Sequence, residues 1–150
     1  MTLYLDTSAL VKLYVDEVGS PLVRSAVDQA ELIATSAIAY IEARAAFVRR
    51  RHERGLSAGD YRRIVRDLDG DWGRYLVMEV TDSLIREGAR LAEVHRLRAY
   101  DAIHLVSAAA VHARLAEPVI FACWDVRLER AAKREGLEPL RSRTYVQHQT

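Results

Sequence analysis

The sequence predicts an α/β fold, a three-layer α/β/α sandwich around a central, mostly parallel sheet of four to five strands. Short apolar segments of strand length alternate along the chain with longer segments whose apolar residues recur at helical spacing. No linker, internal repeat or low-complexity stretch separates these segments. Strands that alternate with helices in this way form a parallel sheet covered by helices on both faces.

Length and composition indicate one globular domain. With 150 residues, of which 50% are hydrophobic and 29% charged, the chain can bury a core. We expect this domain to cover residues 1–140 and a polar tail to follow at 141–150. Charges break every apolar run before membrane-spanning length, and Asp6 interrupts the region that a secretory signal would need. With Cys123 as the single cysteine, these features predict a cytoplasmic protein without membrane contact or an internal disulfide.

The elements of the first half are predicted from apolar spacing and caps. Residues 2–5 form the first strand, and helical spacing begins directly after Asp6. Ser20 is the expected N-cap of a second helix, because Pro21 suits the first helical position. The elements expected next are a strand at 32–35, a helix at 36–55, a helix at 57–72 and a strand at 75–80. Two helices between neighbouring strands exceed one simple crossover, so we expect them to form a small protruding lobe.

The helix at 36–55 carries an apolar pattern of its own. Its residues Ile38, Ile41, Ala45 and Val48 recur at helical spacing. They are predicted to form the buried stripe of this helix, which Gly55 ends.

The second half is predicted to alternate in the same way. Asp82 caps a helix that reaches about His95, and the nearly apolar stretch from Leu97 to Val111 forms another helix. The remaining elements are a strand at 118–122, a helix at 125–136 and a short fifth strand at 138–140.

Four acids are predicted to meet at one edge of the sheet. Asp6 follows the first strand and Asp125 the fourth, and ligands of open parallel sheets bind at the carboxyl ends of the strands. Asp101 begins the helix that feeds the fourth strand, and Glu42 lies in the helix after the second. Taken singly, the three aspartates fit helix caps and the glutamate fits surface charge. Independent caps have no reason to converge on one edge, so a shared site is the stronger interpretation.

A cluster of carboxylates predicts a metal. Such groups cannot all stay ionised without a counter-charge, and an oxygen-only ligand set suits Mg²⁺ or Mn²⁺. No Cys/His pair has the spacing of a zinc site. His104, three residues after Asp101, can touch that acid, but a lone histidine on a packed helix is interpreted as a core residue.

A basic run follows Glu42 on the same helix. The residues considered for RNA binding are Arg49, Arg50, Arg51 and Arg54. They form either a solvated helix face or a rim that binds phosphate. A carboxylate-bound metal beside a basic rim indicates phosphate chemistry.

Four blocks of the sequence resemble the PIN-domain ribonucleases, and among them the VapC-like toxins of prokaryotic toxin–antitoxin pairs. The blocks are DTSALVKLY after the first strand, IEARAAF in the third helix, LRAYDAIHLVSA, and FACWD followed by RLERAA. The resemblance runs from Leu3 to about Gly136. It implies an endoribonuclease that depends on Mg²⁺ or Mn²⁺, cleaves structured RNA of the tRNA or rRNA class, forms a homodimer and is inhibited by a small antitoxin protein.

The resemblance also carries site roles over by position. The residues that match the family's catalytic and metal-binding acids are Asp6, Glu42, Asp101 and Asp125, and Ser8 matches the hydroxyl that orients the first carboxylate or a metal water. One position departs from the family, because Cys123 stands where a Thr or Ser is common. With Trp124 beside it, Asp125 acts on the metal either directly or through water.

Other functions fit the residues less well. Haloacid-dehalogenase-type phosphatases need a second Asp two places after the first, where this chain has Ser8. Receiver domains need a paired acid beside the first Asp and a late Lys after a strand, and neither is evident. The remaining alternative is a catalytically inactive PIN-fold module that binds RNA or protein, although the complete acid set argues against it.

An antitoxin is expected to block the acids with a cationic side chain, because a guanidinium pairs well with carboxylates. The groove beside the site is expected to be apolar, with Leu10, Val11, Leu13 and Tyr14 of the first helix as one wall. The same residues also fit the core or a dimer contact.

Overall fold

Five strands and seven helices make up residues 1–140, the part of the chain that the computed structural model describes. The strands are β1 (Thr2–Leu5), β2 (Leu32–Ser36), β3 (Leu76–Met78), β4 (Val119–Ala122) and β5 (Glu138–Pro139). The helices are α1 (Thr7–Tyr14), α2 (Ser20–Gln29), α3 (Ile38–Arg54), α4 (Ala58–Trp72), α5 (Asp82–His95), α6 (Ala99–Leu115) and α7 (Val126–Arg134). The tail predicted at residues 141–150 lies outside the described residues.

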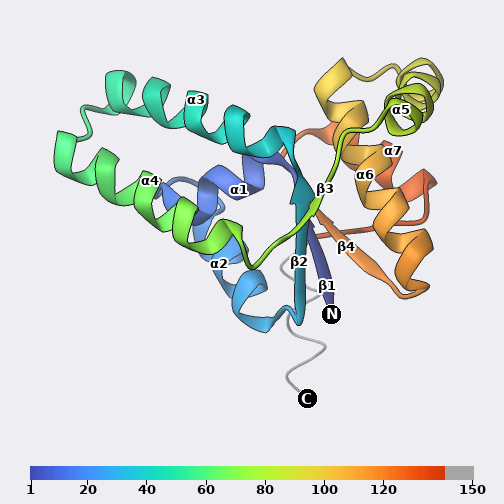
Figure 1. Cartoon of the computed structure of the whole chain (residues 1–150), viewed down its shortest axis with the longest axis horizontal. Coiled ribbons are helices and arrows are strands. Elements are labelled where there is room, and N and C mark those ends of the chain that lie inside the picture. The colour runs from blue at the N-terminus through green and yellow to red at the C-terminus, as the bar shows by residue number, and fades with distance from the viewer. Residues whose placement is uncertain (141–150) are drawn as a thin grey trace.

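The strands form one sheet between two layers of helices (Figure 1). Their order is β3-β2-β1-β4-β5, and every neighbouring pair is parallel. Helices α1 to α4 lie on one side of the sheet, and α5 to α7 lie on the other. The predicted three-layer sandwich is confirmed, with five strands that are all parallel.

The central strand β1 contributes to the cores on both faces of the sheet. Leu3 and Leu5 pack among α1 to α4, whereas Tyr4 packs among α5 to α7, and all three side chains are fully buried. The Tyr4 ring stacks on Phe121 of β4 with the ring centroids 5.4 Å apart. A strand buried on both faces favours apolar side chains, which explains Leu3, Tyr4 and Leu5, while the buried Thr2 donates its hydroxyl to Glu117.

The strand order reverses at β1. The chain winds from β1 outward to β2 and β3, then returns to the opposite side of β1 with β4 and β5. The two connections leave in opposite directions there, so a crevice opens beyond the carboxyl ends of β1 and β4. Asp6 lies at this point, and its N–H donates to the Ala122 carbonyl at the end of β4 over 3.1 Å.

Helix α6 forms much of the second core and places Asp101 at the sheet edge. The residues that α6 buries are Ala102, His104, Leu105, Val106, Ser107, Ala108 and Val111. Its N-cap residue, Arg98, makes no side-chain cap, and Asp101 lies in the first helical turn. No helix within residues 1–140 combines the length and the apolar character needed to cross a membrane.

The buried stripe predicted for α3 is wrong. Ile41 exposes 70% of its surface and Val48 exposes 43%, and Ala45 is also exposed. The residues that α3 buries are Ala39, Ala43, Ala46 and Phe47. The helix therefore packs its small side chains against α1, which lets the two helices approach closely, and turns larger apolar side chains to solvent.

The N-terminus of α2 differs from its prediction by one residue. Gly19 is the N-cap, in a left-handed conformation with φ of 96°, and Ser20 is the first helical residue. The Ser20 hydroxyl instead accepts from the Glu17 N–H at 3.0 Å and donates to the Val15 carbonyl at 2.9 Å. The serine thus fixes the loop before α2 rather than the helix end.

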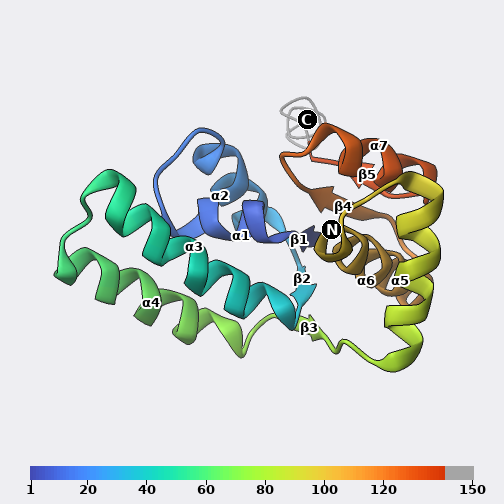
Figure 2. The same ribbon diagram turned by 90° about the horizontal axis from the view of Figure 1, so that it is seen from above.

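Helices α3 and α4 form the predicted protruding lobe, which extends away from the sheet in Figure 2. Tyr14 at the end of α1 ties this lobe to the core, because its hydroxyl donates to Asp71 at 2.8 Å and contacts the Tyr75 hydroxyl. Leu10 and Val11 are buried, with 0% and 2% exposed. Leu10 therefore fills the core, whereas Val11 also lines a cavity beyond the carboxyl end of β1, as was expected of a groove wall.

We expect Phe47→Ala to lower the free energy of unfolding by about 3–5 kcal/mol, the usual effect of emptying a buried aromatic site. The neighbouring change Val48→Ala removes a half-exposed side chain and should have an effect within about 0.5 kcal/mol. Urea unfolding of both variants measures the difference. Equal losses would mean that α3 buries the face predicted from its sequence pattern.

Candidate active site

One cavity beyond the carboxyl ends of β1 and β4 collects the predicted site residues. It has a volume of about 420 Å³. The predicted residues that line it are Asp6, Ser8, Glu42, Asp101 and Asp125. They come from five separate parts of the chain, namely the β1–α1 junction, α1, α3, α6 and the β4–α7 connection. The fold therefore brings together side chains that are far apart in the sequence.

Asp6 is a buried carboxylate with 5% of its surface exposed. It caps α1, because its Oδ1 accepts from the Ala9 N–H at 2.9 Å and from the Ser8 hydroxyl at 2.7 Å. Burial raises the pKa of Asp6; the His104 ring and the two hydrogen bonds oppose this shift, and the charge of Asp101 adds to it. Within residues 1–140 no cationic side chain forms an ion pair with Asp6. The cavity therefore holds negative charge without a full counter-charge.

Glu42 enters the cavity from α3 and is fixed by two side chains. Its Oε1 accepts from the Thr7 hydroxyl at 2.7 Å and lies 3.0 Å from Nε2 of His104. Burial alone would raise the pKa of Glu42, but the contacts with His104 and Thr7 outweigh burial and lower it. Glu42 is therefore an oriented carboxylate of the cavity rather than free surface charge.

His104 connects this carboxylate to the core of the sheet. The ring is 2% exposed, and its Nδ1 lies 2.9 Å from the hydroxyl of Tyr4. Burial raises the pKa of Tyr4 well above its usual value, so the hydroxyl keeps its proton and can donate to Nδ1. The Nε2–H group is then left to face Glu42 and Thr7. The histidine is a satisfied core residue, as expected, and it also orients a site acid.

Asp101 and Asp125 share one guanidinium. Arg98 places Nε 3.3 Å from Asp101 and Nη2 3.7 Å from Asp125. Asp125 also caps α7, because its Oδ1 accepts from the Leu128 N–H at 2.8 Å. The Arg98 side chain is 81% exposed, so water and salt weaken this bridge at the mouth of the cavity.

Cationic side chains also line the cavity beside the acids. They are Lys12, Arg49, Arg50 and Arg98. Glu17 holds two of them in place, with Lys12 at 3.2 Å and Arg50 at 3.0 Å. Burial would raise the pKa of Glu17, but its hydrogen bonds to Arg50 and Lys12 lower it. The site is thus acidic at its floor and basic at its rim.

The four arginines considered for RNA binding divide into two pairs. Arg49 and Arg50 line the cavity. Arg51 instead lies over the Tyr61 ring, 5.3 Å from its centroid, and Arg54 pairs with Glu17 at 3.5 Å. The structure therefore brings only the first pair to the acids.

The ligand set of the cavity fits a hard divalent cation. Carboxylate oxygens are the ligands that Mg²⁺ and Mn²⁺ prefer, and the buried Asp6 carboxylate lacks a full counter-charge. Within the described part of the chain no group of three or more Asp, Glu, His or Cys side chains is already arranged to hold a metal ion. Asp101 contacts Arg98 instead, so a cation bound with Asp6 would have to replace the guanidinium at Asp101.

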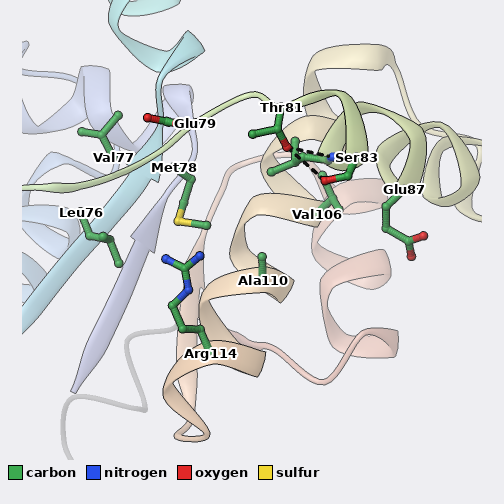
Figure 3. A pocket seen from close by; sticks show the side chains of 11 residues that line it. Leu76, Val77, Met78, Glu79, Thr81, Ser83, Glu87, Val106, Ala110 and Arg114 are labelled. Atoms are coloured by element: carbon green, nitrogen blue, oxygen red, sulfur yellow. Dashed lines mark hydrogen bonds between the residues drawn. The ribbon is translucent and has the colours of Figure 1, made fainter.

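A second cavity, of about 530 Å³, lies between β3, α5 and α6 (Figure 3). Leu76, Met78 and Ala110 form apolar parts of its wall, and the guanidinium of Arg114 points toward Met78. None of the predicted site residues lines this cavity. The acids at the switch in strand order therefore remain the candidate active site.

Fold and site together define a parallel α/β protein with an acid-lined cavity where the strand order reverses. The family model described as the PIN domain matches residues 3–133. The chain belongs to the PIN-domain family, and the family resemblance inferred from its sequence blocks is confirmed.

Known proteins agree with this assignment. Ribonuclease VapC45 of Mycobacterium tuberculosis is 34% identical over 134 residues, which are 89% of this chain and 90% of that protein. The structure of PAE2754 from Pyrobaculum aerophilum has a TM-score of 0.65 at 22% identity and covers 99% of this chain and 94% of its own. A toxin–antitoxin complex from Klebsiella pneumoniae has a TM-score of 0.54 at 14% identity, with 79% of this chain and 83% of that chain covered. The two structures show a shared fold.

Sequence reasoning missed four polar residues of the cavity, Thr7, Lys12, Glu17 and Arg98. Thr7 lies between two residues that were predicted, and Lys12 is one helical turn after Ser8 on the same face of α1. Those positions were a usable signal. Nothing in the sequence indicated that Arg98 bridges two acids, because its second partner comes from a distant connection.

We expect Asp6→Asn to stabilise the metal-free protein at neutral pH. Asparagine keeps the oxygen that caps α1 and removes the buried charge. Because the folded pKa of Asp6 is raised, its contribution to stability is present below the ordinary Asp value of about 4 and is lost as pH rises through the raised value. Urea unfolding in EDTA should show the difference growing in favour of the variant above pH 4.

The parent protein and Asp6→Asn also test whether the acids bind a divalent metal ion. At a Mn²⁺ concentration one hundred times the dissociation constant, the parent should gain about 2.7 kcal/mol, and Asp6→Asn should lose most of that gain. Asp82→Asn changes an exposed acid on α5 and should keep the full gain. A parent protein whose unfolding is indifferent to millimolar Mn²⁺ would contradict a shared metal site.

Proposed function

We propose that this protein is a metal-dependent endoribonuclease, the toxin of a toxin–antitoxin pair, that hydrolyses phosphodiester bonds of structured RNA of the tRNA or rRNA class. One observation carries the proposal, namely a cavity at the switch in strand order that combines the four predicted acids and Glu17 with four cationic side chains. The relative from Mycobacterium tuberculosis is named a ribonuclease, which supports the same reaction.

The acids have distinct roles in the proposed reaction. Asp6 and Asp101 would hold Mg²⁺ or Mn²⁺, with Glu42 and Asp125 as further ligands, directly or through water. Bound there, the metal supplies Lewis-acid stabilisation of the negative charge that develops on the phosphodiester. Ser8 orients Asp6 through its 2.7 Å hydrogen bond.

Glu42 is the best placed group to accept a proton from an attacking water. His104 and Thr7 keep its pKa low and fix its Oε1, so Oε2 is left for the reacting groups. The carboxylate is ionised at neutral pH, which a proton acceptor requires, and its lowered pKa makes it a weaker base than a free glutamate. The proton passes to Glu42 as the new P–O bond forms and the bond to the leaving oxygen breaks.

Arg49 and Arg50 would bind RNA phosphates next to the scissile one. Seven residues separate Glu42 from Arg49 on α3, which is about 10 Å along the helix axis. This distance suits a neighbouring phosphate rather than the reacting one. Lys12 lines the same cavity from α1, the helix that Asp6 caps, and adds positive charge at the cavity itself.

We propose an antitoxin protein as the second partner, together with a homodimeric state. The antitoxin would place an arginine or lysine among the acids, in competition with the metal. Beside Glu42, the exposed apolar residues Ile41 and Val48 of α3 offer a surface for its apolar side chains. The similar structure from Klebsiella pneumoniae is a toxin–antitoxin complex, which supports this kind of partner.

Cleavage of unfractionated tRNA and rRNA with Mg²⁺ or Mn²⁺, and its absence in EDTA, tests the proposed function. Asp6→Ala and Asp101→Ala should abolish cleavage and Glu42→Ala should nearly do so, all in folded protein. Asp125→Ala should keep more activity, because Cys123 departs from the family pattern two residues before it and Asp125 can act through water. Full activity of Asp101→Ala would refute the enzymatic role, and RNA binding without cleavage by the parent would favour an inactive binding module.

The rim is tested by the salt dependence of RNA binding. Arg49→Gln should reduce the slope of log K against log salt by about 0.7–0.9, the value of one lost phosphate contact. Arg51→Gln is the matched control two residues on, and its slope should match the parent because Arg51 lies over Tyr61. Equal slopes in all three proteins would mean that Arg49 belongs to an ordinary solvated helix face and does not bind phosphate.

A further inference from the structure

Trp124 stands at the boundary between the acid-lined cavity and a second, adjoining groove. It lies in the connection between β4 and α7, next to Asp125, and 39% of its surface is exposed. The adjoining groove has a volume of about 550 Å³. Four residues line both spaces, and they are Arg98, Asp101, Trp124 and Asp125. A large aromatic surface is therefore available directly beside the acids.

Gly19 and Lys12 hold the indole of Trp124 in place. A Cβ atom on Gly19 would lie 2.6 Å from Cζ2 of Trp124, so the ring packs directly on backbone that only glycine leaves uncovered. The left-handed φ of 96° at Gly19 also favours glycine there. Lys12 places Nζ 4.7 Å from the ring centroid, a cation–π contact. The ring is thus a fixed surface rather than a loose side chain.

The groove on the far side of Trp124 is basic. Three arginines, Arg96, Arg98 and Arg127, line it against two acids, Asp101 and Asp125. Arg98 bridges two acids, whereas Arg96 and Arg127 form no ion pair within residues 1–140. Arg127 is positioned by a hydrogen bond from its Nη1 to the Arg96 carbonyl at 3.3 Å. Two guanidinium groups are therefore free to bind an anion near the aromatic ring.

We propose that this groove is a nucleotide subsite, in which an unpaired RNA base stacks on Trp124 and the adjoining phosphate binds Arg96 and Arg127. This inference rests on the proposed function, because it places one nucleotide next to the scissile phosphate. An aromatic surface beside cationic side chains is the combination that binds single-stranded nucleic acid. Arg49 and Arg50 then bind the strand on α3, and the groove binds it on the opposite side of the acids.

The charge of the groove favours RNA over a protein inhibitor at this surface. Asp101 and Asp125 also line the groove, but Arg98 pairs with both, so an incoming cationic side chain would face the unpaired guanidinium groups of Arg96 and Arg127. A nucleotide brings a negative phosphate and a flat base, which match the arginines and the indole. Specificity for an unpaired base follows, because a base inside a duplex has no free face for stacking.

Tryptophan fluorescence tests the subsite directly, since the chain has two tryptophans. Trp72 on α4 packs against Tyr40 and Tyr75, away from the groove, and Trp72→Phe leaves Trp124 as the reporter. With Ca²⁺ in place of Mg²⁺, a mixed-sequence single-stranded RNA of ten nucleotides should quench Trp124. The same RNA annealed to its complement should quench it much less. The reciprocal protein, Trp124→Phe, reports from Trp72 and should show no quenching.

Affinity for the same RNA gives a second readout. Trp124→Ala should weaken binding by about five- to a hundredfold, the range for loss of one stacked base, while Trp124→Phe should keep most of the affinity. Ile85→Ala removes an exposed apolar side chain on α5 and should bind as the parent does. Arg96→Gln with Arg127→Gln should lower the salt slope by about 0.7, the value of one lost phosphate contact, and Arg86→Gln with Arg90→Gln on α5 should not.

The outcomes separate this inference from the proposed function. If the parent cleaves RNA, but RNA does not quench Trp124 and Trp124→Ala binds RNA normally, the subsite is overturned and the proposed nuclease activity stands. The subsite is supported if RNA quenches Trp124, if Trp124→Ala loses affinity for RNA, and if Trp124→Phe keeps that affinity. A parent that neither binds nor cleaves RNA overturns both.

Discussion

The burial of carboxylates at the point where the strand order reverses is the constraint on which the rest of this structure depends. A buried acid is unfavourable unless hydrogen bonds or opposite charges compensate it. Each acid meets this requirement in its own way. Asp6 uses the first turn of α1, Glu42 uses Thr7 and His104, and Asp101 uses an exposed guanidinium. The compensation is weakest at Asp6, which is where a cation would contribute most.

His104 shows how the core supports the site. Tyr4 of the central strand contacts one ring nitrogen, and Glu42 of α3 contacts the other. The second core is thus linked through one ring to an acid from the helix layer on the opposite face of the sheet. An oriented carboxylate needs such rigid support, because small displacements of a catalytic group have large effects on rate.

Much of the fold could be predicted from the sequence, because β1, β3 and β4 are short, largely apolar runs and the helices α1, α4, α5 and α7 begin at side-chain caps. Asp6 and Asp125 follow strands that end at the same edge, so their convergence was predictable from topology alone. The face of α3 was not predictable from apolar spacing. Ile41 and Val48 fit a buried stripe as well as a surface, and the close packing of alanines on α1 decided between them. The contacts of Arg98 and Trp124 depend on segments brought together only by the fold.

The central claim is that Asp6 and Asp101 are ligands of one divalent cation. Anomalous diffraction from crystals soaked in Mn²⁺ measures this most directly, since it locates the metal without reference to activity. A cation shared by these two acids would give one strong peak in the acid-lined cavity, between the carboxylates of Asp6 and Asp101, with the Arg98 guanidinium displaced from Asp101. A peak at other acids, or none in that cavity at a Mn²⁺ concentration that supports RNA cleavage, would contradict it.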